Sequence, residues 1–123
     1  MSTENILLRA YADFNAREIE AVLSVMHPDV VWANGMEGGT VLGHAGIRDY
    51  WTRQWSVVDP HVEPLQITTE SDGRFAVLVR QRVRDLTGNL LYEGVVQHVY
   101  RFENGLVKSM EIREPNLNAD GPA

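Results

Sequence analysis

The stretch that decides the fold is residues 90–113, which read LLYEGVVQHVYRFENGLVKSMEIR. Apolar, β-branched and aromatic side chains are frequent in both of its halves, as is typical of β-strands. Asn104-Gly105 separates the halves, and both residues tolerate the positive φ angles of tight hairpin turns. The stretch therefore predicts a strand over 90–102 paired antiparallel with a strand over 106–113.

Two further turn signals extend this hairpin towards the N-terminus. Asp72-Gly73 separates strands that we expect over 62–69 and 75–86. Thr87-Gly88-Asn89 then joins the second of these strands to the one over 90–102. The second half of the chain therefore predicts a sheet of hairpin-linked antiparallel strands.

The first half of the chain has the spacing of helices instead. Apolar residues recur every three or four positions over 6–14, 19–26 and 47–55. A short strand is expected over 30–33, between the second and third helices. Helices followed by hairpin-linked strands are the order of an α+β domain with an antiparallel sheet.

Length, composition and charge limit what the protein binds. The 123 residues fit one domain, which we place at 1–114 with a tail at 115–123. The net charge of -6 and the lack of any basic run argue against a nucleic-acid partner. No apolar run approaches the ~20 residues of a membrane span, so no membrane partner is expected. The chain has no cysteine, which excludes disulfides and thiolate nucleophiles and favours a cytoplasmic location.

Three stretches of sequence resemble the NTF2-like superfamily, and in particular its SnoaL-like members. They are FNAREIEAVL at 14–23 with HPDVVW at 27–32, GHAGIRDYW at 43–51, and HVYRFENGLV at 98–107. The resemblance implies a curved antiparallel sheet packed against N-terminal helices around a cone-shaped cavity. It also implies a homodimer through the outer face of the sheet. The superfamily contains ketosteroid isomerases, polyketide cyclases, limonene-epoxide hydrolases and non-catalytic binding domains, so it fixes the fold rather than the reaction.

The resemblance to the isomerases places three residues at their catalytic positions. Asn34 stands where those enzymes have a carboxylate base, and an amide has no proton to titrate. Ala10 falls at the position of their oxyanion-binding tyrosine, with Tyr11 one residue further on. His98 stands where they have a protonated carboxylic acid. The isomerase set is therefore essentially absent.

The resemblance to the epoxide hydrolases gives a different set. Asn34 matches their asparagine, Trp32 falls at their tyrosine and Arg82 matches their arginine. Their two aspartates are replaced by Arg84 and Ile112, so no carboxylate is left to deprotonate a water molecule.

His98 is the best titratable candidate, because strand alternation puts it on one face with Val96 and Tyr100. A histidine in an apolar cavity can act as acid or base near neutral pH, whereas the alternative is a core histidine with satisfied nitrogens. Arg82 either reaches the cavity and anchors an anionic ligand, or belongs to a solvated strand face.

Large side chains elsewhere could line the cavity, with plain core packing or a surface position as the alternative. They are Trp32, Tyr50, Trp51, Trp55, Val96, Met110, Ile112 and Glu114. The four histidines lack the short spacing of metal-ligand motifs, and the glycines form no phosphate-binding pattern. We therefore expect no metal and no cofactor.

These observations leave two functions open. The first is a SnoaL-like protein that binds a small hydrophobic, ring-shaped ligand and isomerises, cyclises, dehydrates or hydrolyses it. His98 would be its acid or base, with Asn34 and Arg82 orienting the ligand or a water molecule. The second is a non-catalytic dimeric binding or assembly module, with Phe75, Val77 and Val79 at the interface if they point outward.

Overall fold

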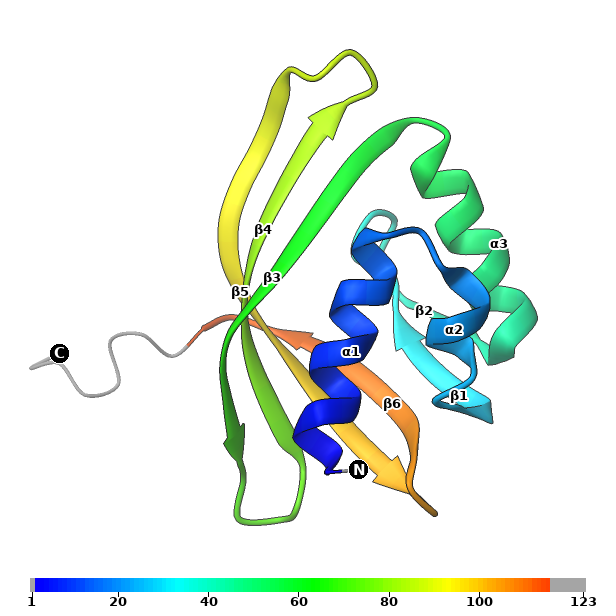
Figure 1. Ribbon diagram of the computed structural model, residues 1–123, viewed down its shortest axis with the longest axis vertical. Coiled ribbons are helices and arrows are strands. Elements are labelled where there is room, and N and C mark those ends of the chain that lie inside the picture. Colours follow the sequence, from blue (N-terminus) through cyan, green and yellow to red (C-terminus); the bar gives the residue numbers. More distant parts are fainter. Residues whose placement is uncertain (1, 116–123) are drawn as a thin grey trace, which may run out of the picture.

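The computed structural model describes residues 2–115, in which helices pack against one side of a curved sheet (Figure 1). The helices are α1 (Thr3–Asn15), α2 (Ile19–Leu23) and α3 (Gly43–Trp55). The strands are β1 (Met26–Ala33), β2 (Thr40–Leu42), β3 (Val58–Thr69), β4 (Phe75–Asp85), β5 (Leu90–Glu103) and β6 (Leu106–Arg113). The α+β class predicted from the sequence is confirmed. Apart from Pro115, the tail expected at 115–123 lies outside the described residues.

The six strands form one sheet in the order β2-β1-β6-β5-β4-β3. Neighbouring strands are antiparallel except for β1 and β6, which run parallel, so the sheet is mixed. Strand β3 begins at Val58, earlier than the expected 62, and it contains Pro60 and Pro64. It pairs only with β4, and an edge strand tolerates prolines because one row of its N–H groups needs no partner.

Two local features fix connections of the fold, namely the turn between β5 and β6 and the end of α1. Asn104 and Gly105 have φ angles of 54° and 81°, as the tight turn between β5 and β6 requires. At the end of α1, the Asn15 side chain donates to Val62 O over 2.7 Å and accepts from Val62 N over 3.0 Å. These two bonds join the helix to the edge strand β3.

The core lies between the helices and the concave face of the sheet. Leu7, Ile47 and Val77 are completely buried and come from α1, α3 and β4 respectively. Val79 is also completely buried, and Phe75 packs against the same cluster. These side chains therefore point into the core rather than outward, so they do not form the dimer interface for which an outward direction was required: Phe75, Val77 and Val79.

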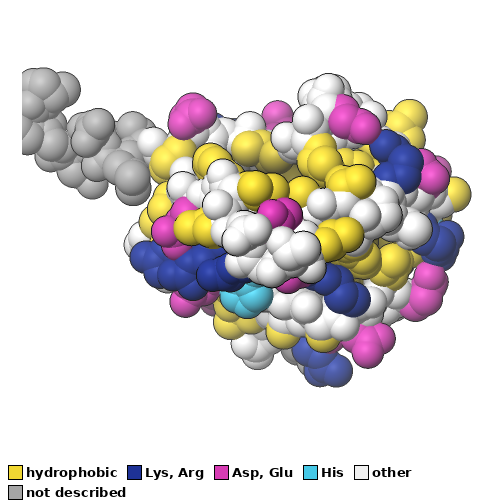
Figure 2. Space-filling model, turned by 90° about the horizontal axis from the view of Figure 1, so that it is seen from above, with side chains coloured by type: hydrophobic (Ala, Val, Ile, Leu, Met, Phe, Trp, Pro, Cys, Tyr) yellow, Lys and Arg dark blue, Asp and Glu magenta, His cyan; other side chains and the backbone are white. Residues whose placement is uncertain are grey.

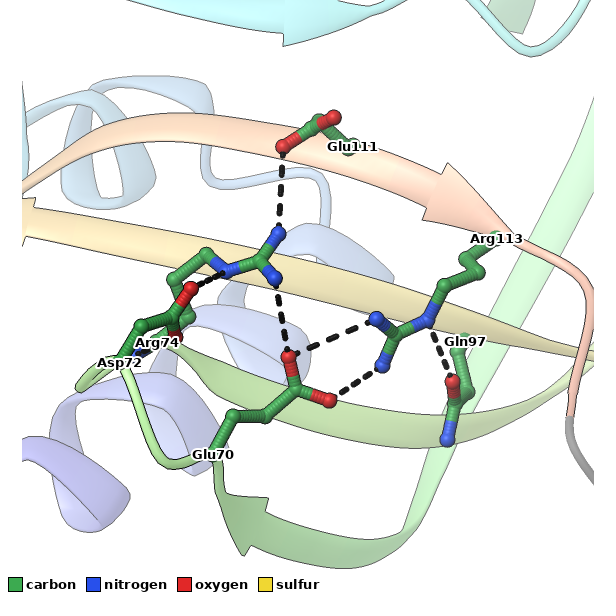
Figure 3. A network of polar contacts seen from close by, with 6 residues as sticks. All are labelled: Glu70, Asp72, Arg74, Gln97, Glu111 and Arg113. Carbon is green, nitrogen blue, oxygen red and sulfur yellow. Dashed lines mark hydrogen bonds and ion pairs between the residues drawn. The ribbon is translucent and has the colours of Figure 1, made fainter.

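The opposite, convex face carries a network of ion pairs and hydrogen bonds that joins the β3–β4 turn to β5 and β6 (Figure 3). Its members are Glu70, Asp72, Arg74, Gln97, Glu111 and Arg113. Glu70 lies between Arg74 and Arg113 and pairs with both. Strand alternation places Ala76 and Val99 on this face, where they are only 3% and 2% exposed. This part of the outer face is therefore polar at its surface.

Within residues 2–115, no helix combines the length and the apolar character that a membrane crossing requires.

Candidate functional site

A cavity of about 470 Å³ lies between the helices and the concave face of the sheet, within the usual size range of small-molecule sites. Its walls come from all three helices and from strands β1 and β3 to β6, and most of the lining residues are apolar. Met36, Tyr92 and Ile112 line it and are 47%, 48% and 40% exposed, so they mark its mouth. The end of α3 and the β4–β5 hairpin lie at the top of Figure 1, and Figure 2 shows hydrophobic side chains gathered on that face.

Deep in the cavity, three side chains form a buried hydrogen-bonded chain. Tyr100 Oη donates to Tyr11 Oη over 2.7 Å, and Tyr11 Oη lies 2.8 Å from Nδ1 of His98. Tyr11 comes from α1, whereas His98 and Tyr100 are alternate residues of β5, so the chain links helix and sheet. All three residues are at most 6% exposed, and the rings of Tyr11 and His98 are stacked.

The direction of this chain assigns the tautomer of His98. Tyr100 has no other hydrogen-bond partner within residues 2–115, so it gives its proton to Tyr11. Tyr11 therefore directs its own proton to Nδ1 of His98, and the neutral imidazole carries its proton on Nε2. His98 lines the cavity, and Nε2 has no partner among the described residues. The free end of the chain is thus an N–H donor available to a ligand.

Burial keeps all three groups neutral at physiological pH. It lowers the pKa of His98 from 6.5 to about 4, because the charged imidazolium loses its hydration there. Burial also raises the pKa of Tyr11 well above its usual value, and the neighbouring Tyr100 adds to this effect. The pKa of Tyr100 is raised for the same reason, more than the bond to Tyr11 lowers it. His98 is therefore a weak base and a good neutral hydrogen-bond donor.

The structure does not bring Asn34 or Arg82 to His98. Asn34 is 7% exposed, but its Oδ1 accepts the backbone N–H groups of Met36 and Glu37 over 3.1 and 2.8 Å. Its Nδ2 donates to Glu37 Oε1 over 2.9 Å, so the side chain is used to hold the loop at the mouth. Arg82 pairs with Glu93 on the convex face. Strand alternation turns Gln81 and Val83, on either side of it, into the cavity instead. No Asp, Glu, Lys or Arg among the described residues lines the cavity.

The residues expected to contact a ligand divide into three groups. The cavity is lined by Trp32, Tyr50, Trp51, Val96, Met110 and Ile112. Trp55 lies behind this wall, with its ring stacked on Trp51 at 5.9 Å and beneath the Arg17 guanidinium at 4.8 Å. Glu114 lies away from the cavity, beside Glu70 and Arg113.

Sequence reasoning missed several polar lining residues, above all Tyr11. The resemblance to the isomerases placed Ala10 at the position of their oxyanion-binding tyrosine, yet Tyr11 is the residue that reaches His98. Ala10 and Tyr11 both line the cavity, because adjacent helix positions are only 100° apart. Strand alternation had placed Tyr100 on the face of His98, whereas nothing in the sequence indicated that Gln54, His61 and Gln81 line the cavity.

At the mouth, Tyr92 lies over Gly94 on the same face of β5. A Cβ atom added at Gly94 would stand 2.2 Å from Tyr92 Oη and 2.7 Å from its Cζ. The tyrosine therefore occupies the space that any other side chain at 94 would need. A similar fit occurs at Gly35, where an added Cβ would stand 3.2 Å from Ile112 Cδ1.

No group of three or more His, Asp or Glu side chains within residues 2–115 is placed to hold a metal ion.

Comparison with known protein families identifies the scaffold. The model of the SnoaL-like domain matches residues 7–110, which is most of the chain. The chain belongs to the SnoaL-like domain family. This membership confirms the resemblance inferred from the sequence stretches, although the family contains more than one activity. A comparison with curated protein sequences gave no match.

Solved structures of the same fold include several with ligands. TerC, co-crystallised with polyporic acid, is 31% identical with a TM-score of 0.78, over 94% of this chain and 92% of TerC. An NTF2-like protein of unknown function from Burkholderia pseudomallei is 27% identical with a TM-score of 0.80, over 94% and 92% of the two chains. A Mycobacterium tuberculosis protein in complex with estradiol-17beta-hemisuccinate is 18% identical with a TM-score of 0.72, over 89% of each chain, and shows the fold alone.

Proposed function

We propose that this SnoaL-like protein binds a small hydrophobic ring compound in its cavity, with a carbonyl, enolate or phenol oxygen of that compound against His98 Nε2. The observation that carries this proposal is the single N–H donor at the end of a buried chain, in a cavity with mostly apolar walls. The bound compound would then undergo isomerisation or cyclisation without a cofactor.

The chemistry of the proposal is hydrogen-bond stabilisation of an oxyanion. A neutral histidine that donates from Nε2 stabilises negative charge as it develops on the ligand oxygen, and a dry surround strengthens this interaction. Tyr100 and Tyr11 polarise the imidazole through the chain, because successive hydrogen bonds reinforce one another. No carboxylate among the described lining residues can remove a proton from carbon. The fitting substrate is therefore one whose C–H lies between two carbonyl groups and is acidic enough to give its proton to water that enters through the open mouth.

Two neighbours support a ring-shaped ligand. TerC was crystallised with polyporic acid, and the Mycobacterium tuberculosis protein with an estradiol ester. Trp32 and Trp51 pack edge to face at 5.7 Å in the cavity wall, and aromatic faces of this kind suit flat rings.

The first test is titration of the protein with polyporic acid and with estradiol, monitored by quenching of tryptophan fluorescence, since Trp32 and Trp51 line the cavity. We expect both the wild type and Arg82→Ala to bind, because Arg82 lies on the convex face. His98→Ala should bind about tenfold more weakly, since the ligand oxygen loses its donor in an apolar site. Equal affinity of His98→Ala and the wild type, with both folded by circular dichroism, would contradict the proposal.

A second candidate is a non-catalytic binding or assembly module. The lack of a lining carboxylate within residues 2–115 favours it, because a carboxylate is a common general base and His98 is a weak one. NMR spectra of a bound diketone, recorded over hours, separate the two candidates: conversion supports catalysis, whereas binding without conversion supports the module. A homodimer through the outer sheet face and a cytoplasmic location stay predictions, and sedimentation velocity tests the first.

A further inference from the structure

Tyr92 is a polar group at the cavity mouth that the proposed function does not use. Its Oη has no hydrogen-bond partner within residues 2–115, although the side chain lines the cavity. Because the ring lies over Gly94, the hydroxyl points along β5 towards Val96 and His98, which share the same face of the strand. The hydroxyl and the Nε2 donor of His98 therefore stand at two ends of one apolar wall.

The separation of these two groups limits the length of a ligand. Gly94 and His98 are four residues apart, so the Tyr92 hydroxyl and the imidazole are roughly 13 Å apart along the strand. With one hydrogen bond at each end, roughly 8 Å remains between the two oxygens of a ligand that bridges them. A single six-membered ring is too short for this distance, whereas two fused six-membered rings with oxygens at their far ends fit it.

We propose that Tyr92 is the outer binding residue of this cavity, and that the ligand carries a second oxygen, at the end opposite the one bound by His98. This inference rests on the proposed function, because it takes His98 as the inner contact. Gly94 makes it possible by leaving room for the tyrosine ring. Gly94 is not among the residues with positive φ, so an alanine there is compatible with the backbone and conflicts only with Tyr92.

The test compares two rigid probes, naphthalene-2,6-diol with an oxygen at each end and 2-naphthol with one. The wild type should bind the diol about fivefold more tightly than the probe with one oxygen, because the diol makes one more neutral hydrogen bond. This factor comes in addition to the statistical advantage of a symmetrical probe. Tyr92→Phe should abolish this preference while leaving the affinity for 2-naphthol unchanged. Gly94→Ala should abolish it too, although it removes no polar atom. Leu91→Ala is the matched control, since Leu91 is 58% exposed and does not line the cavity.

Each outcome decides between the claims. A preference for the diol that survives Tyr92→Phe overturns the role of Tyr92, and equal binding of both probes by the wild type does the same while leaving the proposed function standing. If neither probe binds the wild type, and polyporic acid and estradiol do not bind either, both the proposed function and this inference fail. If polyporic acid binds and neither naphthalene probe does, the inferred ligand length is wrong and the inner contact at His98 stands.

Discussion

The substitution Tyr11→Phe tests the buried chain most sharply, because Tyr11 is its middle member. The phenylalanine leaves two buried groups without partners, namely the hydroxyl of Tyr100 and Nδ1 of His98. An orphaned buried polar group costs about 1–3 kcal/mol, so we expect a loss of about 3 kcal/mol in the free energy of unfolding. Tyr100→Phe removes one end of the chain and orphans no donor, so it should cost only about 1 kcal/mol.

The assay is equilibrium unfolding in urea for the wild type, both single variants and the double variant. The m-values should stay equal, so that shifts in midpoint report stability alone. The double variant should be less destabilised than the sum of the single variants, because Tyr100→Phe removes the hydroxyl that Tyr11→Phe orphans. Equal losses for the two single variants, or strict additivity, would refute the assignment of Tyr11 as the central donor.

Three further substitutions have definite expected outcomes. His98 has its pKa lowered to about 4, so the unfolded chain takes up the proton first as the pH falls below 6.5. The stability that neutral His98 contributes above pH 6.5 is therefore lost by about pH 4. Between pH 7 and 4, the free energy of unfolding of His98→Gln, measured in urea, should fall by about 3 kcal/mol less than that of the wild type. Asn34→Ala should cost about 2 kcal/mol by the same assay, because it removes the acceptor of two backbone N–H groups; no loss would show that the turn holds without the amide. Arg82→Ala should change stability by less than about 0.5 kcal/mol, since its pair with Glu93 is solvent-exposed, and a larger loss would contradict its placement.

Local patterns were sufficient to predict most of the architecture. Asp72-Gly73 and Asn104-Gly105 lie in turns between antiparallel strands, as expected, because their backbone conformations are set by the residues themselves. Strand alternation also placed Val96 and Tyr100 on the face of His98. Tertiary pairing decided what local patterns could not, such as the parallel contact of β1 with β6.

The site was harder to predict because its geometry depends on small differences of register. One position on α1 separates Ala10 from Tyr11, and only the packed helix shows which one reaches His98. One position on β4 separates Gln81, which lines the cavity, from Arg82, which does not. Asn34 was expected at the ligand, but its side chain is used by the turn that follows β1.

The account rests on a neutral His98 that donates from Nε2 into the cavity, and NMR of the isotope-labelled imidazole tests this directly. The account predicts a proton on Nε2 and none on Nδ1 from pH 8 down to about 5, with titration near 4. Addition of polyporic acid should move the Nε2 proton resonance downfield, because it forms a hydrogen bond. A proton on Nδ1, a titration near 6.5, or an Nε2 resonance unchanged by bound ligand would contradict it.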